Sequence, residues 1–278
     1  MSFKLFATDL DGTLLDRSGA IHPADRRAIA ELVRRGVPVT ILTGRMYSGT
    51  RDIARAIELD GPIGCLDGCA IVAVRDDRHL ASRALAAPAG RLVQDALARV
   101  SPAVFLLARD QIFHDARGEP FAQYLHGWTP QLTPVDDVSA APHWDADGGV
   151  GGVIAVATRE AIERLLTALT PAAALVAPRV FPVRREEPAG PYAMLIQPAG
   201  VTKGSALQWI AAHHGVAPSE VVAVGDWLND VPMFAAAGRS FAMGHAADEV
   251  KAAATECLRA DVTTGGGIAE AAERAGLL

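Results

Sequence analysis

The sequence is poor in cysteine, which limits both disulfides and metal sites built from thiols. It has three cysteines in 278 residues, Cys65, Cys69 and Cys257. An odd number of cysteines makes a poor disulfide framework. No histidine or cysteine pair near Cys65 and Cys69 completes a zinc set. We therefore expect free thiols and a reducing compartment, which favours a cytoplasmic location.

The sequence also lacks long apolar runs and an excess of basic charge. No apolar run approaches the roughly 18 residues that a membrane span requires. The first residues lead straight into a predicted strand, with no room for a signal peptide. Lysine and arginine number 26 against 32 acidic residues, a net charge of -6. We expect neither a membrane nor a nucleic acid as a partner, and the sequence does not reveal the oligomeric state.

What the sequence does have is an alternation of apolar strands and helical patterns at both ends of the chain. Half of the residues are hydrophobic, and the length allows two domains. Strands that alternate with helices predict a parallel sheet with right-handed crossovers, a Rossmann-like α/β core. The predicted strands are 3–7, 37–42, 63–66, 221–224 and 241–243, and the main predicted helices are 24–35, 203–214, 246–256 and 267–276.

The middle of the chain follows a different pattern, which predicts a second domain. Residues 70–85 are typical of a hairpin, and residues 127–149 are rich in Pro, Gly and Asp. We interpret 86–197 as an inserted α+β domain, with 1–85 and 198–278 forming the core. Its predicted helices are 89–100 and 159–169, and its predicted strands are 103–108, 152–157, 175–184 and 192–197.

Polar side chains stand where the predicted core strands end. Ligands of parallel sheets bind beyond the carboxyl ends of the strands, so we expect these side chains to lie close together. Carboxylates match a hard divalent cation, most simply Mg²⁺. A hydroxyl, a glycine amide and a lysine match the oxygens of a phosphoryl group, whose charge the metal would balance. The residues are Asp9, Asp11, Thr43, Gly44, Asp226 and Asp230 at strand ends, together with Lys203 at the start of a predicted helix.

These stretches resemble the four motifs of the haloacid dehalogenase (HAD) superfamily. Their order and spacing resemble the Cof-type, class IIB phosphatases, in which a large α+β cap of C2 type is inserted after the third core strand. The resemblance covers nearly all the core, whereas the cap matches by position and size. The motifs are Asp9-Leu10-Asp11-Gly12-Thr13, Thr43-Gly44-Arg45, Lys203-Gly204 and Gly225-Asp226-x-x-Asn229-Asp230.

The resemblance implies an enzyme, a Mg²⁺-dependent phosphoric monoester hydrolase. Its substrates would be small phosphorylated metabolites, sugar phosphates or similar, cleaved through an aspartyl-phosphate intermediate. In this family Asp9 corresponds to the nucleophile, and Asp11 to the acid and base, with its carbonyl on the metal. Asp9 and Asp226 would supply metal carboxylates, and Asp230 would hold metal-bound waters.

The resemblance also implies how the phosphoryl group is held. Thr43, the Gly44 amide and Lys203 would bind its oxygens, and Asn229 would orient Lys203 or the phosphate. Arg45 is a candidate contact to the cap or the substrate, with an exposed helix-start arginine as the equal alternative.

Three positions depart from the usual family pattern. Asp67-Gly68 replaces the usual Asn-Gly, which would disfavour very anionic substrates and makes Asp67 a candidate substrate contact. Trp227 interrupts the fourth motif, and we expect it to pack against the protein rather than wall the entrance. His245 stands where Asn is common, and we expect a loop histidine with satisfied hydrogen bonds rather than a catalytic one.

Two other functions remain open from the sequence. A sugar phosphomutase would share the motifs but require a bisphosphate. A metabolite-binding protein that no longer turns over would also share them, although the presence of every catalytic residue argues against it. The substrate itself leaves no readable motif in residues 86–197.

Overall fold

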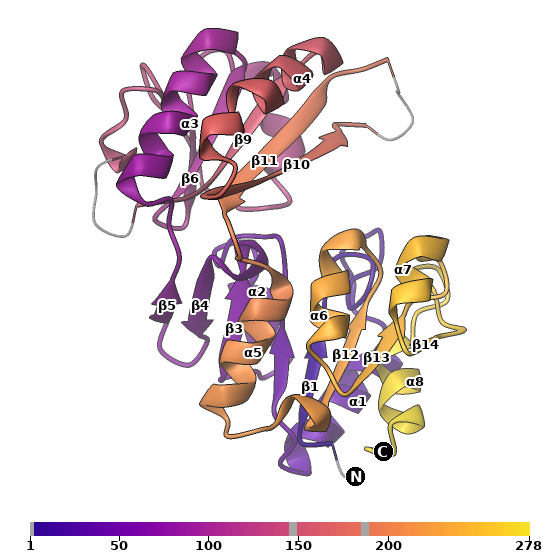
Figure 1. Ribbon diagram of the computed structural model, residues 1–278. Helices are drawn as coiled ribbons and strands as arrows, with labels where there is room; N and C mark the ends of the chain where they lie inside the picture. Colours follow the sequence, from indigo (N-terminus) through magenta and orange to yellow (C-terminus); the bar gives the residue numbers. More distant parts are fainter. Residues whose placement is uncertain (1–2, 145–148, 185–188) are drawn as a thin grey trace. The chain divides into compact units, whose positions relative to one another are not determined.

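The computed structural model describes residues 3–144, 149–184 and 189–278, which form two compact units. Unit 1 consists of Met1–Gly44, Arg51–Ala81 and Val201–Leu278, and unit 2 of Arg45–Thr50 and Ser82–Gly200. Both are drawn in Figure 1. The domain boundaries inferred from the sequence, 1–85 with 198–278 for the core and 86–197 for the inserted domain, stay a prediction.

Unit 1 is built on a parallel sheet with the strand order β14-β13-β12-β1-β2. Its two central strands, β1 and β12, pair from Leu5 with Val221 to Thr8 with Val224, so they end together at one edge. All residues of both strands are buried, which explains their nearly continuous apolar sequences. The predicted α/β core is confirmed. The strands are β1 (Leu5–Thr8), β2 (Val39–Ile41), β12 (Val221–Gly225), β13 (Arg239–Ala242) and β14 (Glu256–Cys257).

The helix α5 (Lys203–His213) shows how local sequence positions a polar side chain in unit 1. Thr202 and Ser205 form a capping box, in which the amide of each residue donates to the hydroxyl of the other. The helix therefore begins at Lys203. The other helices of the unit are α1 (Pro23–Arg34), α2 (Arg51–Ala56), α6 (Val231–Ala235), α7 (Asp248–Ala253) and α8 (Gly267–Arg274).

The third predicted strand is not a full member of the parallel sheet. β3 (Pro62–Cys65) pairs antiparallel with β4 (Ala70–Ala73), and a single bridge between Leu42 and Gly64 links it to the strand before it. The chain turns back at once after β3, because Leu66 and Asp67 have positive φ angles of 49° and 54°. β4 and β5 (Arg78–Ser82) confirm the predicted hairpin.

Unit 2 is a mostly antiparallel sheet with helices on one face, as predicted for an α+β domain. Its strand order is β10-β11-β9-β6-β7-β8. Sequence analysis missed β7 and β8. β8 lies in the stretch rich in Pro, Gly and Asp, and residues 145–148 of that stretch lie outside the described residues. The elements are α3 (Ala87–Val100), β6 (Ala103–Ala108), β7 (Gln111–His114), β8 (Leu132–Pro134), β9 (Val150–Ala157), α4 (Arg159–Ala168), β10 (Val176–Pro182) and β11 (Tyr192–Pro198).

Residues 45–50 belong to unit 2, although they directly follow Thr43 and Gly44 in the chain. The Met46 amide donates to the Trp128 carbonyl at 3.0 Å. A side chain on Gly49 would place its Cβ only 2.3 Å from the same carbonyl oxygen, so the close approach requires glycine. Sequence analysis did not foresee this assignment, because it depends on a partner some eighty residues away. Among the described residues, none of the helices combines the length and apolar character that crossing a bilayer requires.

Candidate active site

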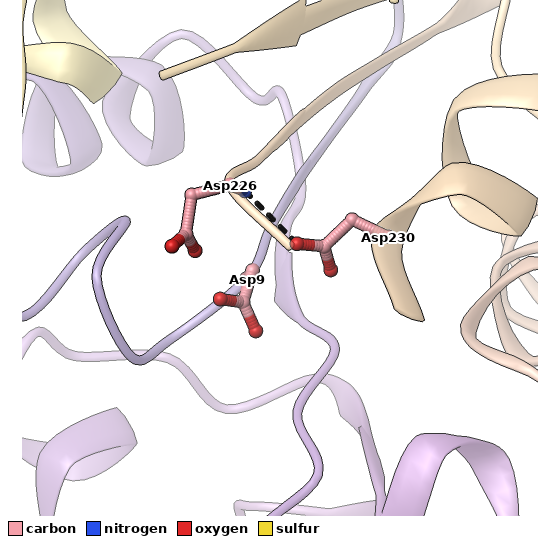
Figure 2. A group of neighbouring side chains, drawn as sticks. All are labelled: Asp9, Asp226 and Asp230. Carbon is pink, nitrogen blue, oxygen red and sulfur yellow. Dashed lines mark hydrogen bonds between the residues drawn. The ribbon is translucent and has the colours of Figure 1, made fainter. Parts of the chain in front are cut away.

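Three carboxylates meet at the edge of the unit 1 sheet where β1 and β12 end. Asp9 follows β1 and Asp226 follows β12, so the shared register of the two strands places them side by side. Asp230 comes from the short turn after Asp226. One oxygen of each carboxylate lies within 4.8 Å of the others (Figure 2). The structure therefore brings together the acids of the first and fourth motifs, as the sequence predicted.

Two glycines make this close approach of carboxylates possible. Gly12 has a φ of +83°, and a Cβ there would lie 2.7 Å from Asp226 Oδ2. A Cβ on Gly225 would lie 2.5 Å from Asp230 Cγ. Any larger residue would push the acids apart. Asp226 is further fixed by the Thr13 hydroxyl, which donates to its Oδ1 at 3.0 Å.

Lys203 is the cation of this cluster. Only 1% of its side chain is exposed, and its Nζ lies 2.5 Å from Asp9 Oδ1 and 2.6 Å from Asp230 Oδ1. The other oxygen of Asp230 accepts the amides of Asp226 and Trp227, each at 2.9 Å. Asp230 is thus held by a side chain and two backbone donors, which makes it the anchor of Lys203.

The charges of the cluster do not balance. Burial raises the pKa of Asp9 well above its usual value, the carboxylates of Asp230 and Asp226 raise it further, and Lys203 opposes them. Burial also raises the pKa of Asp230, again against Lys203. Burial by itself lowers the pKa of Lys203, but Asp230 and Asp9 outweigh it and raise that pKa, so the lysine stays charged. One ammonium thus faces three carboxylates, and the cluster would be stabilised by another cation.

The cluster fits a hard metal ion. Its donors are carboxylate oxygens, the ligands that Mg²⁺ prefers. Oxygens that share one Mg²⁺ at about 2.1 Å lie about 3 to 4 Å apart, which agrees with the spread of the cluster. Asp9, Asp226 and Asp230 are the side chains among the described residues that could hold it, directly or through water.

His245 is a residue of this site that sequence reasoning underrated. Its Nδ1 accepts the Val262 amide at 3.1 Å, so the ring proton lies on Nε2. Nε2 is 3.2 Å from Asp226 Oδ2 and donates to it. The expectation of satisfied hydrogen bonds was right, but the histidine orients a carboxylate of the cluster. A polar residue just after β13 follows the same strand-end rule that identified the acids.

The residues expected to hold phosphate lie at the neighbouring strand ends. Thr43 is buried, and its amide donates to the Gly64 carbonyl at 2.9 Å, while its own carbonyl accepts the Asp67 amide at 2.9 Å. The Asn229 carboxamide donates to Asp67 Oδ1 at 2.8 Å, and its Oδ1 is buried without a partner. A Cβ on Gly44 would lie 3.7 Å from Asp67 Oδ1. Asp67 thus lies among the predicted phosphate-binding residues and engages the amide donor of Asn229.

Three other residues that the sequence singled out, Asp11, Arg45 and Trp227, are not part of the carboxylate cluster. Asp11 is exposed beside the cluster, where its side chain can reach solvent. Arg45 belongs to unit 2 and donates to the Gly49 carbonyl at 3.3 Å. Trp227 is 39% exposed, so its side chain is partly covered by the protein, and the expectation that it packs there stays a prediction.

Comparison with known proteins agrees with the sequence resemblance. A sequence model of the haloacid dehalogenase-like hydrolases matches residues 6–271. The chain is 28% identical to an HMP-PP phosphatase of Serratia proteamaculans, over 90% of this chain and 86% of the relative. It is 29% identical to the 5-amino-6-(5-phospho-D-ribitylamino)uracil phosphatase YwtE of Bacillus subtilis, over 91% of both chains.

A solved structure extends the similarity to the whole fold. It is a haloacid dehalogenase-like hydrolase from Bacteroides thetaiotaomicron, with a TM-score of 0.81 and 23% identity. The alignment covers 98% of this chain and 99% of that one. At this identity the likeness shows a shared fold, inserted unit included.

Proposed function

The chain belongs to the haloacid dehalogenase-like hydrolases, and we propose that it is a Mg²⁺-dependent phosphatase of small phosphorylated metabolites. The observation that carries this proposal is the cluster of Asp9, Asp226 and Asp230, with Lys203 bonded to Asp9. Two relatives that align with nearly the whole chain are named as phosphatases, which supports phosphatase activity. Because those names differ in substrate, they support a class of phosphoesters rather than one compound.

In the proposed reaction Asp9 attacks the phosphorus atom. The P–O bond to the leaving alcohol breaks, and Asp11 gives that oxygen its proton. The aspartyl-phosphate is then hydrolysed by a water molecule that Asp11 deprotonates, which restores both carboxyl groups. Exposure of Asp11 suits this role, because the residue must meet substrate and water in turn.

The other residues of the site would act through charge and position. Lys203, the Thr43 hydroxyl and the Gly44 amide would bind the phosphoryl oxygens as negative charge develops on them. Mg²⁺ held by Asp9 and Asp226, and through water by Asp230, would supply the charge that lets a dianionic ester enter this acidic cluster. His245 and Thr13 would keep Asp226 aligned for that ion.

The test compares wild-type protein with Asp9→Asn on a panel of phosphate monoesters, with and without Mg²⁺, while released phosphate is measured. Asn keeps the shape of Asp9 but cannot act as the nucleophile, so we expect turnover to fall about 10⁴-fold or more. Asp16→Asn, an exposed acid away from the cluster, is the matched control and should retain full turnover.

Three outcomes would contradict the proposal. Near-normal turnover by Asp9→Asn would remove the assigned nucleophile. Release that requires an added bisphosphate would indicate a phosphomutase. Binding of phosphoesters without release by the wild-type protein would indicate a metabolite-binding protein.

A further inference from the structure

Unit 2 contains a pocket that the proposed chemistry does not use. It lies on the face of the sheet away from α3 and α4, and the alternation of side chains along the strands creates it. Residues 104 and 106 of β6 and 153 and 155 of β9 pack in the core beneath the helices. Phe105, Ile154 and Val156 therefore point to the opposite face, where they line the pocket.

Five aromatic rings are among the eleven residues that line the pocket. The chain has only eight phenylalanines, three tyrosines and four tryptophans, yet five of these fifteen line this one space. Phe105 forms part of its buried floor, whereas the other four are half-buried at its rim, within reach of solvent. Phe181 comes from β10, and Phe121, Tyr124 and Trp128 come from the segment after β7.

The size of the pocket selects for a single ring. Its volume is about 180 Å³. An apolar cavity of about 150 Å³ holds one benzene molecule. A single six-membered ring with a substituent therefore fits in this space.

The walls of the pocket select for a flat ring with polar substituents. Aromatic walls stack on planar rings and gain less from puckered, saturated ones. The guanidinium of Arg184 lies 5.3 Å from the centre of the Tyr124 ring and places a positive charge at the rim. A ring that carries oxygen or nitrogen atoms at its edge would complement this charge.

We propose that this pocket binds a planar, unsaturated six-membered ring. The wall of the pocket is held by the segment that follows Gly44, because the Met46 amide donates to the Trp128 carbonyl.

The experiment uses full-length protein in Mg²⁺ and two alcohols of similar size, benzyl alcohol and cyclohexylmethanol. Affinity is measured by ligand-observed NMR. We expect benzyl alcohol to bind about 3- to 10-fold more tightly, from stacking on the aromatic walls. Tyr124→Ala removes a wall and Ala193→Leu fills the floor, so each should reduce this preference towards unity.

Tyr192→Ala is the matched control. Tyr192 is also half-buried and also has an arginine over its ring, Arg159 at 5.2 Å, but it does not line the pocket. This variant should keep the preference for the flat ring. Equal affinity for the two alcohols in wild-type protein, or a preference that survives both Tyr124→Ala and Ala193→Leu, would overturn the proposal.

Discussion

The two units of this protein each form a candidate site beside a sheet, but one site consists of charged side chains and the other of aromatic ones. In unit 1 the groups are charged and stand at strand ends, where backbone register and two glycines fix them. In unit 2 they are aromatic and stand on the face of the sheet, where packing fixes them. Removing the partner of a buried charge leaves that charge unpaired, which costs much stability. Truncating an aromatic side chain at a pocket removes only packing contacts. Substitutions in unit 1 should therefore be far more damaging than substitutions in unit 2.

We expect the largest loss of folding stability from a substitution of Lys203. Lys203→Met leaves Asp9 and Asp230 buried without their shared cation, and breaking such a pair costs about 3–5 kcal/mol. Lys4→Met is the matched control, because Lys4 also pairs with an acid at 2.6 Å, but 58% of its side chain is exposed. An exposed pair contributes only about 0–1 kcal/mol. Urea unfolding of both variants in metal-free buffer measures the difference.

Tyr124→Ala extends that measurement to unit 2. Its ring is half-buried at the rim of a pocket, so its removal should cost less free energy of unfolding than Lys203→Met does. If Tyr124→Ala proved as damaging as Lys203→Met, the distinction between a site made by charge and a site made by packing would fail.

A substitution of His245 tests whether its hydrogen bond to Asp226 strengthens metal binding at the cluster. His245→Ala removes the hydrogen bond that orients Asp226 without removing a carboxylate. Loss of such a supporting partner typically weakens metal binding about 10- to 100-fold. The Mg²⁺ concentration that gives half-maximal thermal stabilisation measures this effect. His245→Gln keeps an amide donor and should recover part of the affinity, whereas equal affinity in all three proteins would leave His245 without a positioning role.

The same contrast explains what the sequence could predict. Asp9 and Asp226 were predictable because each follows an apolar run, and parallel strands bring their ends together. Asp230 follows four residues later, in the same motif as Asp226. His245 lies in the loop after β13, three residues past its end, and a search for polar residues near strand ends could have found it. The third strand was misjudged because the positive φ angles of Leu66 and Asp67 turn the chain back at once.

The aromatic pocket, in contrast, has no signature in the sequence. Its five rings come from positions 105 to 181 with no common spacing, and only the fold brings them to one face. Residues 45–50 were equally unpredictable, because their place in unit 2 depends on Trp128. Polar residues at strand ends can be identified from one sequence, whereas a pocket formed by residues from many elements cannot.

The smallest expected effect concerns the balance of charge without metal. Burial raises the pKa of Asp9, so the folded protein is more stable with Asp9 neutral than with Asp9 ionised. The stability gained from a raised carboxyl pKa is complete below the unfolded value of about 3.9 and is lost as the pH rises through the folded value. Asp9→Asn imitates the neutral form at every pH. In buffer with a chelator it should therefore unfold at a higher temperature than wild-type protein at neutral pH, and the gap should close as the pH falls.

Mg²⁺ should reverse this order, because the ion stabilises the ionised carboxylate that Asn lacks. Thermal unfolding of both proteins between pH 4 and 8, with chelator and with Mg²⁺, measures both effects. An Asp9→Asn variant that is less stable than wild-type protein in chelator at neutral pH would mean that Lys203 alone compensates the buried charge. Unit 1 would then need no further cation, and the contrast with unit 2 would lose its physical basis.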